Sequence, residues 1–117
     1  MTIRIKRVYE PYSVEDGYRI LVDRLWPRGM KQEDARIDKW LKEIAPSTAL
    51  RKWFNHEPEK WEQFRQKYHT ELNQSAAFDE LLSYLRENKI VTLLYAAREE
   101  KYNHAIVLQQ FINDHSQ

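Results

Sequence analysis

The sequence predicts a single small layered α/β domain over residues 1–117, with a three-stranded, largely parallel sheet flanked by about five helices. Three short segments with strand-like patterns are separated by longer stretches of helical periodicity, and this alternation is typical of parallel sheets. The length of 117 residues fits one hydrophobic core, because chains divide into several cores only when they are considerably longer.

The three predicted strands differ in how strongly they are marked. Residues 3–9 alternate imperfectly between apolar and charged side chains, as an edge or half-buried strand does. Residues 18–25 centre on an aliphatic run, and residues 90–96 are apolar almost throughout, which predicts burial on both sheet faces. We expect these two strands to be parallel. Residues 10–17 are too few for an ordinary crossover helix, so the first two strands could form an antiparallel pair, and the direction of the first stays open.

Apolar residues at helical spacing predict the remaining elements. Residues 37–44 are predicted to be helical up to the following proline. Ser47 and Ser75 are predicted to cap two further helices, and Pro58 fits the first turn of the helix between them. The last helix is expected over about residues 103–113.

Composition excludes several classes of protein. With 42% hydrophobic and 32% charged residues, the chain is predicted to be neither disordered nor membrane-embedded, and its first residues show no secretory signal. It has no Cys, which excludes disulfides, thiolate metal ligands and cysteine nucleophiles. No His and carboxylate pair has a recognised metal spacing, and the two glycines, Gly17 and Gly29, cannot form a Gly-rich phosphate loop. No metal or other cofactor is therefore predicted.

Two polar segments follow the second and third predicted strands, at the edge where open α/β sheets bind ligands. Residues 23–31 carry two arginines and a lysine, and residues 95–98 end in an arginine shortly before the final helix. If the strands are neighbours, these cations converge near the free N–H groups of that helix, and this combination favours an anion. The ligand-binding candidates are Arg24, Arg28, Tyr95, Arg98 and Asn103, with Lys31 nearby.

His104 is the candidate acid or base, because it stands near the predicted start of the last helix, where Asn103 is the expected cap. Asp23 is the best second titrating group. The competing interpretation is structural: His104 fixes a loop, and the arginines pair with neighbouring carboxylates such as Glu99 and Glu100. The other histidines, His56, His69 and His115, lie in settings that point to no site.

The aromatic residues are predicted to be core. Trp26 lies in a turn marked by proline and glycine and is expected to plug the core, since a tryptophan buries a large area. A stripe of aromatics at helical spacing could be a base-stacking platform, but this spacing is more typical of a buried helix face. The stripe consists of Trp40, Trp53, Phe54, Trp61, Phe64 and Tyr68.

Five segments, in order along nearly the whole chain, resemble the YeaO-like branch of the domain-of-unknown-function 488 family. They are Gly17-Tyr18-Arg19-Ile20-Leu21-Val22-Asp23-Arg24-Leu25-Trp26-Pro27-Arg28-Gly29, Trp40-Leu41-Lys42-Glu43-Ile44-Ala45-Pro46-Ser47, Leu50-Arg51-Lys52-Trp53-Phe54, Val91-Thr92-Leu93-Leu94-Tyr95-Ala96-Ala97-Arg98 and Asn103-His104-Ala105.

The resemblance implies a small cytoplasmic, bacterial-type α/β domain whose biochemical activity is not established. Broader relatives carry Cys-His-Arg before the last helix and Asp-Val-Arg at the end of an inner strand. Here Asn103-His104-Ala105 and Asp23-Arg24-Leu25 occupy these places. Any thiol chemistry of those relatives therefore cannot be transferred to this chain.

Three functions are compatible with these observations, and the first is favoured. A binding module would hold a small ligand bearing a phosphate or carboxylate. A small cofactor-independent enzyme would use His104 as acid or base, with Asp23 and the arginines in support. A nucleic-acid-binding module would use residues 1–31, which hold seven basic and four acidic residues. The chain is expected to be a monomer or a weak homodimer.

Overall fold

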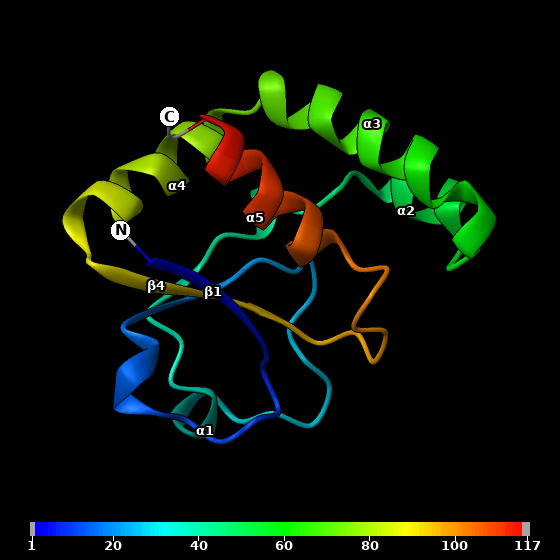
Figure 1. The fold of residues 1–117 in the computed structure, drawn as a ribbon. Helices are drawn as coiled ribbons and strands as arrows, with labels where there is room; N and C mark the ends of the chain where they lie inside the picture. The colour runs from blue at the N-terminus through cyan, green and yellow to red at the C-terminus, as the bar shows by residue number, and fades with distance from the viewer. Residues whose placement is uncertain (1, 116–117) are drawn as a thin grey trace.

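Four parallel strands form the sheet in the computed structural model, which describes residues 2–115 (Figure 1). β4 lies between β1 and β2 and pairs in parallel with both, while β3 extends the sheet beyond β2. The α/β class and the parallel pairing of the second and third predicted strands are confirmed, but the sheet has four strands where three were predicted. The strands are β1 (Thr2–Arg7), β2 (Tyr18–Leu21), β3 (Lys39–Trp40) and β4 (Ile90–Tyr95).

The antiparallel alternative for the first two strands is wrong. β1 and β2 flank β4 on opposite sides and run in the same direction. The connection over residues 8–17 contains only a 3₁₀ turn at Val14–Asp16. This connection is long enough without a helix, because ten extended residues span roughly 30 Å. The chain has only to return from the end of β1 to the start of β2, which is 4 residues long.

The helix predicted over residues 37–44 is also wrong. Lys39–Trp40 forms β3, followed by a 3₁₀ turn at Lys42–Ile44. The apolar residues of this segment do not share one face: Ile37 and Trp40 pack against one side of the sheet, whereas Leu41 and Ile44 belong to the core on the other. The pairing of β3 with β2 also gives hydrogen-bond partners to backbone groups on the edge of β2. A helix at residues 37–44 would leave these groups without partners in the sheet.

The other predicted helices are confirmed, and one short helix, α1, was not predicted. The side chains of Ser47 and Ser75 accept the N–H groups of Leu50 and Phe78 at 3.1 and 3.3 Å, as N-caps do. Pro58 opens a 3₁₀ turn immediately before α3. None of the helices in residues 2–115 combines the length and apolar character that crossing a membrane requires. The helices are α1 (Gln32–Ala35), α2 (Thr48–Phe54), α3 (Trp61–Asn73), α4 (Ala76–Glu87) and α5 (His104–His115).

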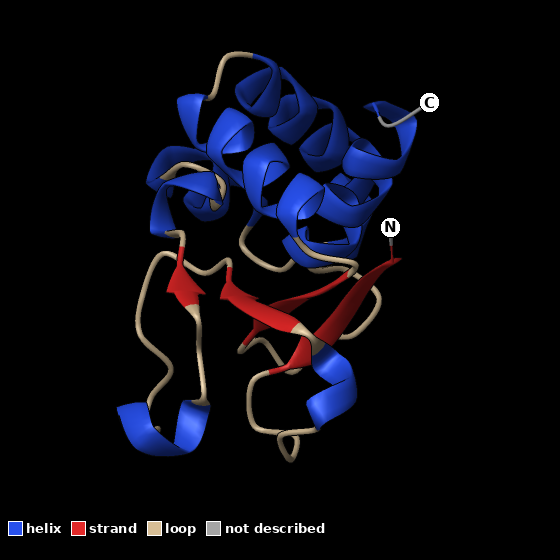
Figure 2. Cartoon of the chain, turned by 90° about the vertical axis from the view of Figure 1, so that its left-hand side faces the viewer, coloured by secondary structure: helices blue, strands red, loops and turns tan. Residues whose placement is uncertain are grey.

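Both faces of the sheet are covered, as the apolar sequence of β4 predicts. The helices α2 to α5 gather over one face, where they bury the main core (Figure 2). The other face is covered by the segment that includes α1, through partly buried side chains packed on Val8, Leu21 and Leu94. Trp26 is one of these side chains, in agreement with its predicted role as a core plug.

A buried ion cluster fixes the connection between β1 and β2. The carboxylate of Asp16, which is 4% exposed, accepts hydrogen bonds from Lys6 and from the 1% exposed Arg19. The Arg19 guanidinium also donates to the backbone oxygens of Arg36 at 3.0 Å and Ala35 at 2.9 Å. These contacts tie the segment around α1 to the start of β2.

Candidate functional site

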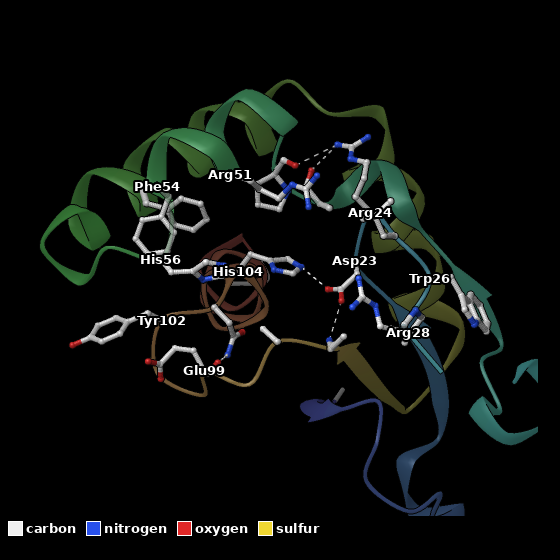
Figure 3. A pocket seen from close by; sticks show the side chains of 18 of the residues that line it. Asp23, Arg24, Trp26, Arg28, Arg51, Phe54, His56, Glu99, Tyr102 and His104 are labelled. Carbon is white, nitrogen blue, oxygen red and sulfur yellow. Dashed lines mark hydrogen bonds and ion pairs between the residues drawn. The ribbon is translucent and has the colours of Figure 1, made fainter. Parts of the chain in front are cut away.

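A cavity of about 370 Å³ lies beyond the carboxyl ends of β2 and β4, beside the first turn of α5 (Figure 3). This size lies within the usual range for small-molecule sites, roughly 300–1,000 Å³. Its position agrees with the edge predicted from the sequence. Five of the predicted residues line it, namely Asp23, Arg24, Arg28, Asn103 and His104.

Asp23 and His104 form a pair on the cavity wall. His104 Nε2 lies 2.9 Å from the Val22 carbonyl oxygen and 3.2 Å from Asp23 Oδ1. Both neighbours are acceptors, so Nε2 carries the proton and Nδ1 is left for another partner. Asp23 Oδ2 accepts the Ala96 N–H at 2.9 Å. Asp23 therefore joins the ends of β2 and β4 to the start of α5.

The edge of the His104 ring packs against Tyr68, which supports its orientation. The ring centroids are 6.3 Å apart, and the Tyr68 hydroxyl donates to the Ile44 carbonyl at 2.7 Å. Burial, with the nearby carboxylates of Glu71 and Asp23, raises the pKa of Tyr68 well above its usual value, so the hydroxyl keeps its proton. The residue that packs on the His104 ring from the core is therefore uncharged.

Arg24 lines the cavity but is partly committed to the protein. Its guanidinium donates to the carbonyl oxygens of Ala45 at 3.1 Å and Pro46 at 3.4 Å, and it forms an ion pair with Glu43 at 3.3 Å. Its Nε is buried and has no partner among the described residues. The structural alternative, in which the arginines pair with carboxylates, is thus confirmed for Arg24, although its partner is Glu43. Within residues 2–115 the arginines of the two segments form no ion pair with Asp23, Glu99 or Glu100.

Arg28 stands on a turn that several hydrogen bonds hold in place. The Tyr9 hydroxyl donates to the Arg28 carbonyl at 2.8 Å, and Trp26 Nε1 donates to the Met30 carbonyl at 2.7 Å. Gly29 adopts a φ of 78°, which closes the turn. The Arg28 side chain is exposed on the cavity wall and makes no hydrogen bond or ion pair with any described residue.

Arg51 brings a second unengaged cation to the cavity, from the helix α2. Ser47 caps this helix and is itself bound by the Glu71 carboxylate, which accepts the Ser47 hydroxyl at 2.6 Å. Arg51 is exposed, and within residues 2–115 its guanidinium, like that of Arg28, has no protein partner. Two free guanidinium groups from separate segments therefore face one cavity.

Asn103 is 4% exposed and caps α5, as predicted. Its Oδ1 accepts the Ile106 N–H at 3.2 Å, and its Nδ2 donates to the carbonyl oxygens of Glu99 and Glu100. The side chain is thus fully used in closing the loop between β4 and α5. Asn103 shapes the cavity wall and has little hydrogen-bonding capacity left for a ligand.

Three predicted residues do not meet at the cavity. Tyr95 is 5% exposed and belongs to the core between the sheet and the helices, because it shares a face of β4 with Val91 and Leu93. Arg98 and Lys31 are exposed and lie outside the cavity lining. Within residues 2–115, no group of three or more His, Cys, Asp or Glu side chains is placed to hold a metal ion.

Aromatic residues form the opposite end of the cavity. Phe54 and Phe64 pack with ring centroids 4.6 Å apart, and Tyr102 contacts the cavity from the loop before α5. His56 and Glu99, both exposed, complete this end. In Figure 3, Phe54, His56 and Tyr102 lie at one end of the view and Arg24 and Arg28 at the other.

Comparison with known proteins places the chain in a family. Residues 2–117 match the family described as "Inactive DUF488-N3 subclade". The chain belongs to this subclade. It is 47% identical over 112 residues to the uncharacterized protein YeaO of Escherichia coli, a match that covers 96% of this chain and 97% of YeaO. It is 43% identical over 111 residues to an uncharacterized protein of Mycobacterium tuberculosis, covering 95% and 93% of the two chains. No solved structure matches the chain.

The DUF488 assignment confirms the family resemblance predicted from the sequence. Two residues of the family-like segments lie on the cavity wall: Asp23 stands shortly after β2, and His104 opens α5. The chain has no Cys, so no thiol can stand at the place of Asn103. The cavity wall of this DUF488 chain carries a histidine–aspartate pair beside free arginines.

The cavity of this DUF488 chain also includes residues that sequence reasoning missed. Arg51 and His56 lie on and after α2, and Tyr102 and Glu99 lie in the loop before α5. One signal was available for Arg51: it stands within a family-like segment of Leu50 to Phe54. His56 follows Asn55 in a pair of residues with positive φ, a conformation that only the structure reveals.

Proposed function

We propose that this chain binds a small ligand bearing a phosphate or carboxylate group in the cavity beyond β2 and β4. The observation that carries the proposal is the pair of unengaged guanidinium groups of Arg28 and Arg51 on the wall of one cavity. Guanidinium groups bind phosphate and carboxylate oxygens through paired, charge-assisted hydrogen bonds. The N-terminus of α5 contributes a further partial positive charge.

Arg24, Arg28 and Arg51 bring three positive charges to the cavity lining, and Asp23 and Glu99 bring two negative ones, so the lining keeps a net positive charge. Asp23 Oδ2 is used by the Ala96 N–H, and Asp23 Oδ1 lies against the His104 ring. Glu99 is on the loop at the aromatic end, where one of its oxygens accepts the Lys101 N–H at 3.0 Å. Among the described residues Arg28 and Arg51 have no carboxylate partner, so these two cations of the lining are the ones available to a negatively charged ligand.

Removing either free arginine is expected to weaken binding of a simple anion. The substitutions Arg28→Ala and Arg51→Ala should each raise the Kd for inorganic phosphate about tenfold, because each removes a charge-assisted hydrogen bond of about 1.5 kcal/mol. Titrations followed by NMR of the backbone amides would measure this, since they detect millimolar affinities. Succinate, titrated in parallel, would establish whether a carboxylate is accepted as well.

Matched controls are available next to both arginines. Lys31→Ala removes an exposed cation from the segment of Arg28, and Lys52→Ala removes one from α2 beside Arg51, but neither lysine lines the cavity. Both controls should leave the Kd within about twofold of that of the unsubstituted chain. If all four variants bind phosphate as the unsubstituted chain does, the proposed site is wrong.

Acid–base catalysis is the second candidate, favoured by the 3.2 Å contact between Asp23 and His104. Two observations weigh against it. The family is described as an inactive subclade, and the His104 Nε2 proton is donated to the Val22 carbonyl. Incubation with phosphorylated ligands, followed by ³¹P NMR, separates the candidates: a new phosphorus signal that His104→Gln abolishes would support catalysis, and an unchanged spectrum would support binding alone.

A further inference from the structure

We propose that the anionic ligand is a nucleotide, with its phosphate at Arg28 and Arg51 and its base at the aromatic end of the same cavity. This inference rests on the proposed function and adds a ligand class to it. The cavity has two chemically different ends, cationic near Arg28 and aromatic near Phe54 and Tyr102, and Figure 3 shows His104 between them. A ligand that matches both ends carries an anionic group and a planar ring.

The aromatic end offers ring surfaces that the fold holds in place. Phe54 and Phe64 are 6% and 3% exposed, so they form a fixed base to this end of the cavity. Tyr102 is held edge-on against Trp61, with ring centroids 5.4 Å apart. The His56 ring lies 6.5 Å from Phe54. The accessible rings of this end are the exposed His56 and the half-buried Tyr102, and stacking of a nucleobase on such rings contributes about 1–3 kcal/mol per base.

Polar atoms at the aromatic end favour the binding of a nucleobase over the binding of a hydrocarbon. Glu99 Oε1, the Tyr102 hydroxyl and the ring nitrogens of His56 make no hydrogen bond with other residues in the described part of the chain. A hydrocarbon placed here would remove these groups from water without replacing their hydrogen bonds. A base presents amine donors and ring acceptors along its edge and can satisfy them.

The size of the cavity is suited to one nucleotide. A volume of about 370 Å³ is larger than inorganic phosphate needs and lies at the lower end of the roughly 300–1,000 Å³ range of sites that hold one small molecule. The bound nucleotide could be free or could be the phosphorylated end of a single strand, because the two share the groups that the cavity recognises.

The test compares ligands that differ only in the base. The full chain is titrated with inorganic phosphate, ribose 5-phosphate and the four common ribonucleoside 5′-monophosphates at one salt concentration. We expect at least one mononucleotide to bind about tenfold or more tightly than ribose 5-phosphate, the factor that a stacking contribution of 1.4 kcal/mol gives. His56→Ala and Tyr102→Leu should abolish this tenfold advantage and leave the Kd for inorganic phosphate unchanged.

The variants and controls make each result decisive. His56 is exposed, so His56→Ala should fold even if Tyr102→Leu does not, and Tyr12→Leu removes an exposed tyrosine that does not line the cavity. If phosphate binds but no mononucleotide exceeds ribose 5-phosphate, the nucleotide inference is overturned and the proposed function stands. If phosphate, the phosphorylated ligands and succinate all fail to perturb cavity resonances, the proposed function itself fails. A tenfold advantage that survives both variants would place the base elsewhere and overturn the inference.

A final arm identifies the source of the nucleotide. A 5′-phosphorylated trinucleotide that begins with the preferred base is titrated beside the mononucleotide. Equal affinity supports a free nucleotide, whereas more than tenfold tighter binding with a steep salt dependence supports the end of a strand. Failure of the trinucleotide to bind also supports the free nucleotide.

Discussion

Replacement of Asp16 by Asn is expected to lower the free energy of unfolding at pH 7 by about 3 kcal/mol. The Asp16 carboxylate is buried between Lys6 and Arg19, and the guanidinium of Arg19 is itself 1% exposed. Asparagine keeps a hydrogen-bond acceptor but leaves the buried positive charge of Arg19 without its counterion. The destabilisation is expected to extend beyond the contact between Asp16 and Arg19. The Arg19 guanidinium also donates to the backbone oxygens of Ala35 and Arg36, in the segment before β3.

The pKa of Asp16 sets the pH range of this effect. Burial would raise it, but hydrogen bonds from Lys6, the Ser13 N–H and Arg19 outweigh burial and lower the pKa of Asp16 below its ordinary value of 3.8. A lowered native pKa means that the stabilisation is complete above pH 3.8 and is lost as the pH falls through the native value. The difference between the unsubstituted chain and Asp16→Asn should therefore be constant near neutrality and shrink below pH 3.8.

Urea unfolding from pH 7 to pH 3 measures both the difference and its pH dependence. Glu15→Gln is the matched control: it removes a carboxylate from the same 3₁₀ turn, but Glu15 is exposed and its side chain makes no hydrogen bond among residues 2–115. This control should change the unfolding free energy by less than about 0.5 kcal/mol. Equal stability of Asp16→Asn and the unsubstituted chain at pH 7 would contradict the role assigned to the ion cluster.

The elements that the sequence predicted correctly are those whose conformation is set by residues close to them in the chain. The caps at Ser47, Ser75 and Asn103 were predictable because each is set by side chains within a few residues of the helix start. Lys39–Trp40 was misassigned because its conformation depends on a partner far along the chain, the free edge of β2. Apolar spacing of three and four residues fits a helix, but here the first two of these residues pack in one core and the last two in the other.

The residues of the candidate site that could be predicted are those that directly follow a strand or open a helix. Asp23, Arg24 and Arg28 follow β2 directly, and His104 opens α5, so the carboxyl-edge rule for parallel sheets was enough to bring them together. Arg51 and His56 reach the cavity because α2 packs above that edge, a tertiary arrangement that the strand pattern does not predict, and Tyr102 reaches it from the loop before α5. Tyr95 was misjudged for the opposite reason: it stands at a strand end, but its face of the strand points into the core.

The edge of the sheet that carries the cavity and the buried ion cluster lie at opposite ends of β2. Asp16 and Gly17 precede this strand, and Asp23 and Arg24 follow it. The strand has 4 residues and pairs with β4 along its whole length, so a displacement at its start is carried to the cavity. Changes near residue 17 are therefore expected to affect the site as well as stability.

Gly17→Ala is expected to be the most damaging single substitution, lowering the free energy of unfolding by about 4 kcal/mol. Gly17 has φ 66° and ψ −135°, a conformation that residues with a Cβ rarely adopt. An alanine Cβ would lie 2.2 Å from the Ile90 carbonyl oxygen and 2.8 Å from Ile90 Cβ. Because the closest contact is with backbone, no side-chain rotation can relieve it, and β2 must move away from β4.

Gly29→Ala separates this clash from simple backbone strain. Gly29 also has a positive φ, of 78°, but an added Cβ there would meet nothing within 4 Å. Gly29→Ala should therefore cost only the strain of the left-handed conformation, about 1 kcal/mol. Urea unfolding of both variants gives the difference, and in the folded fraction of Gly17→Ala the amide signal of Ala96, which is bound by Asp23, should shift. Similar losses of unfolding free energy in both variants would show that the close approach of Gly17 to Ile90 does not limit the packing of β2 on β4. An unshifted Ala96 signal would show that a displacement at the start of β2 does not change the structure at the cavity.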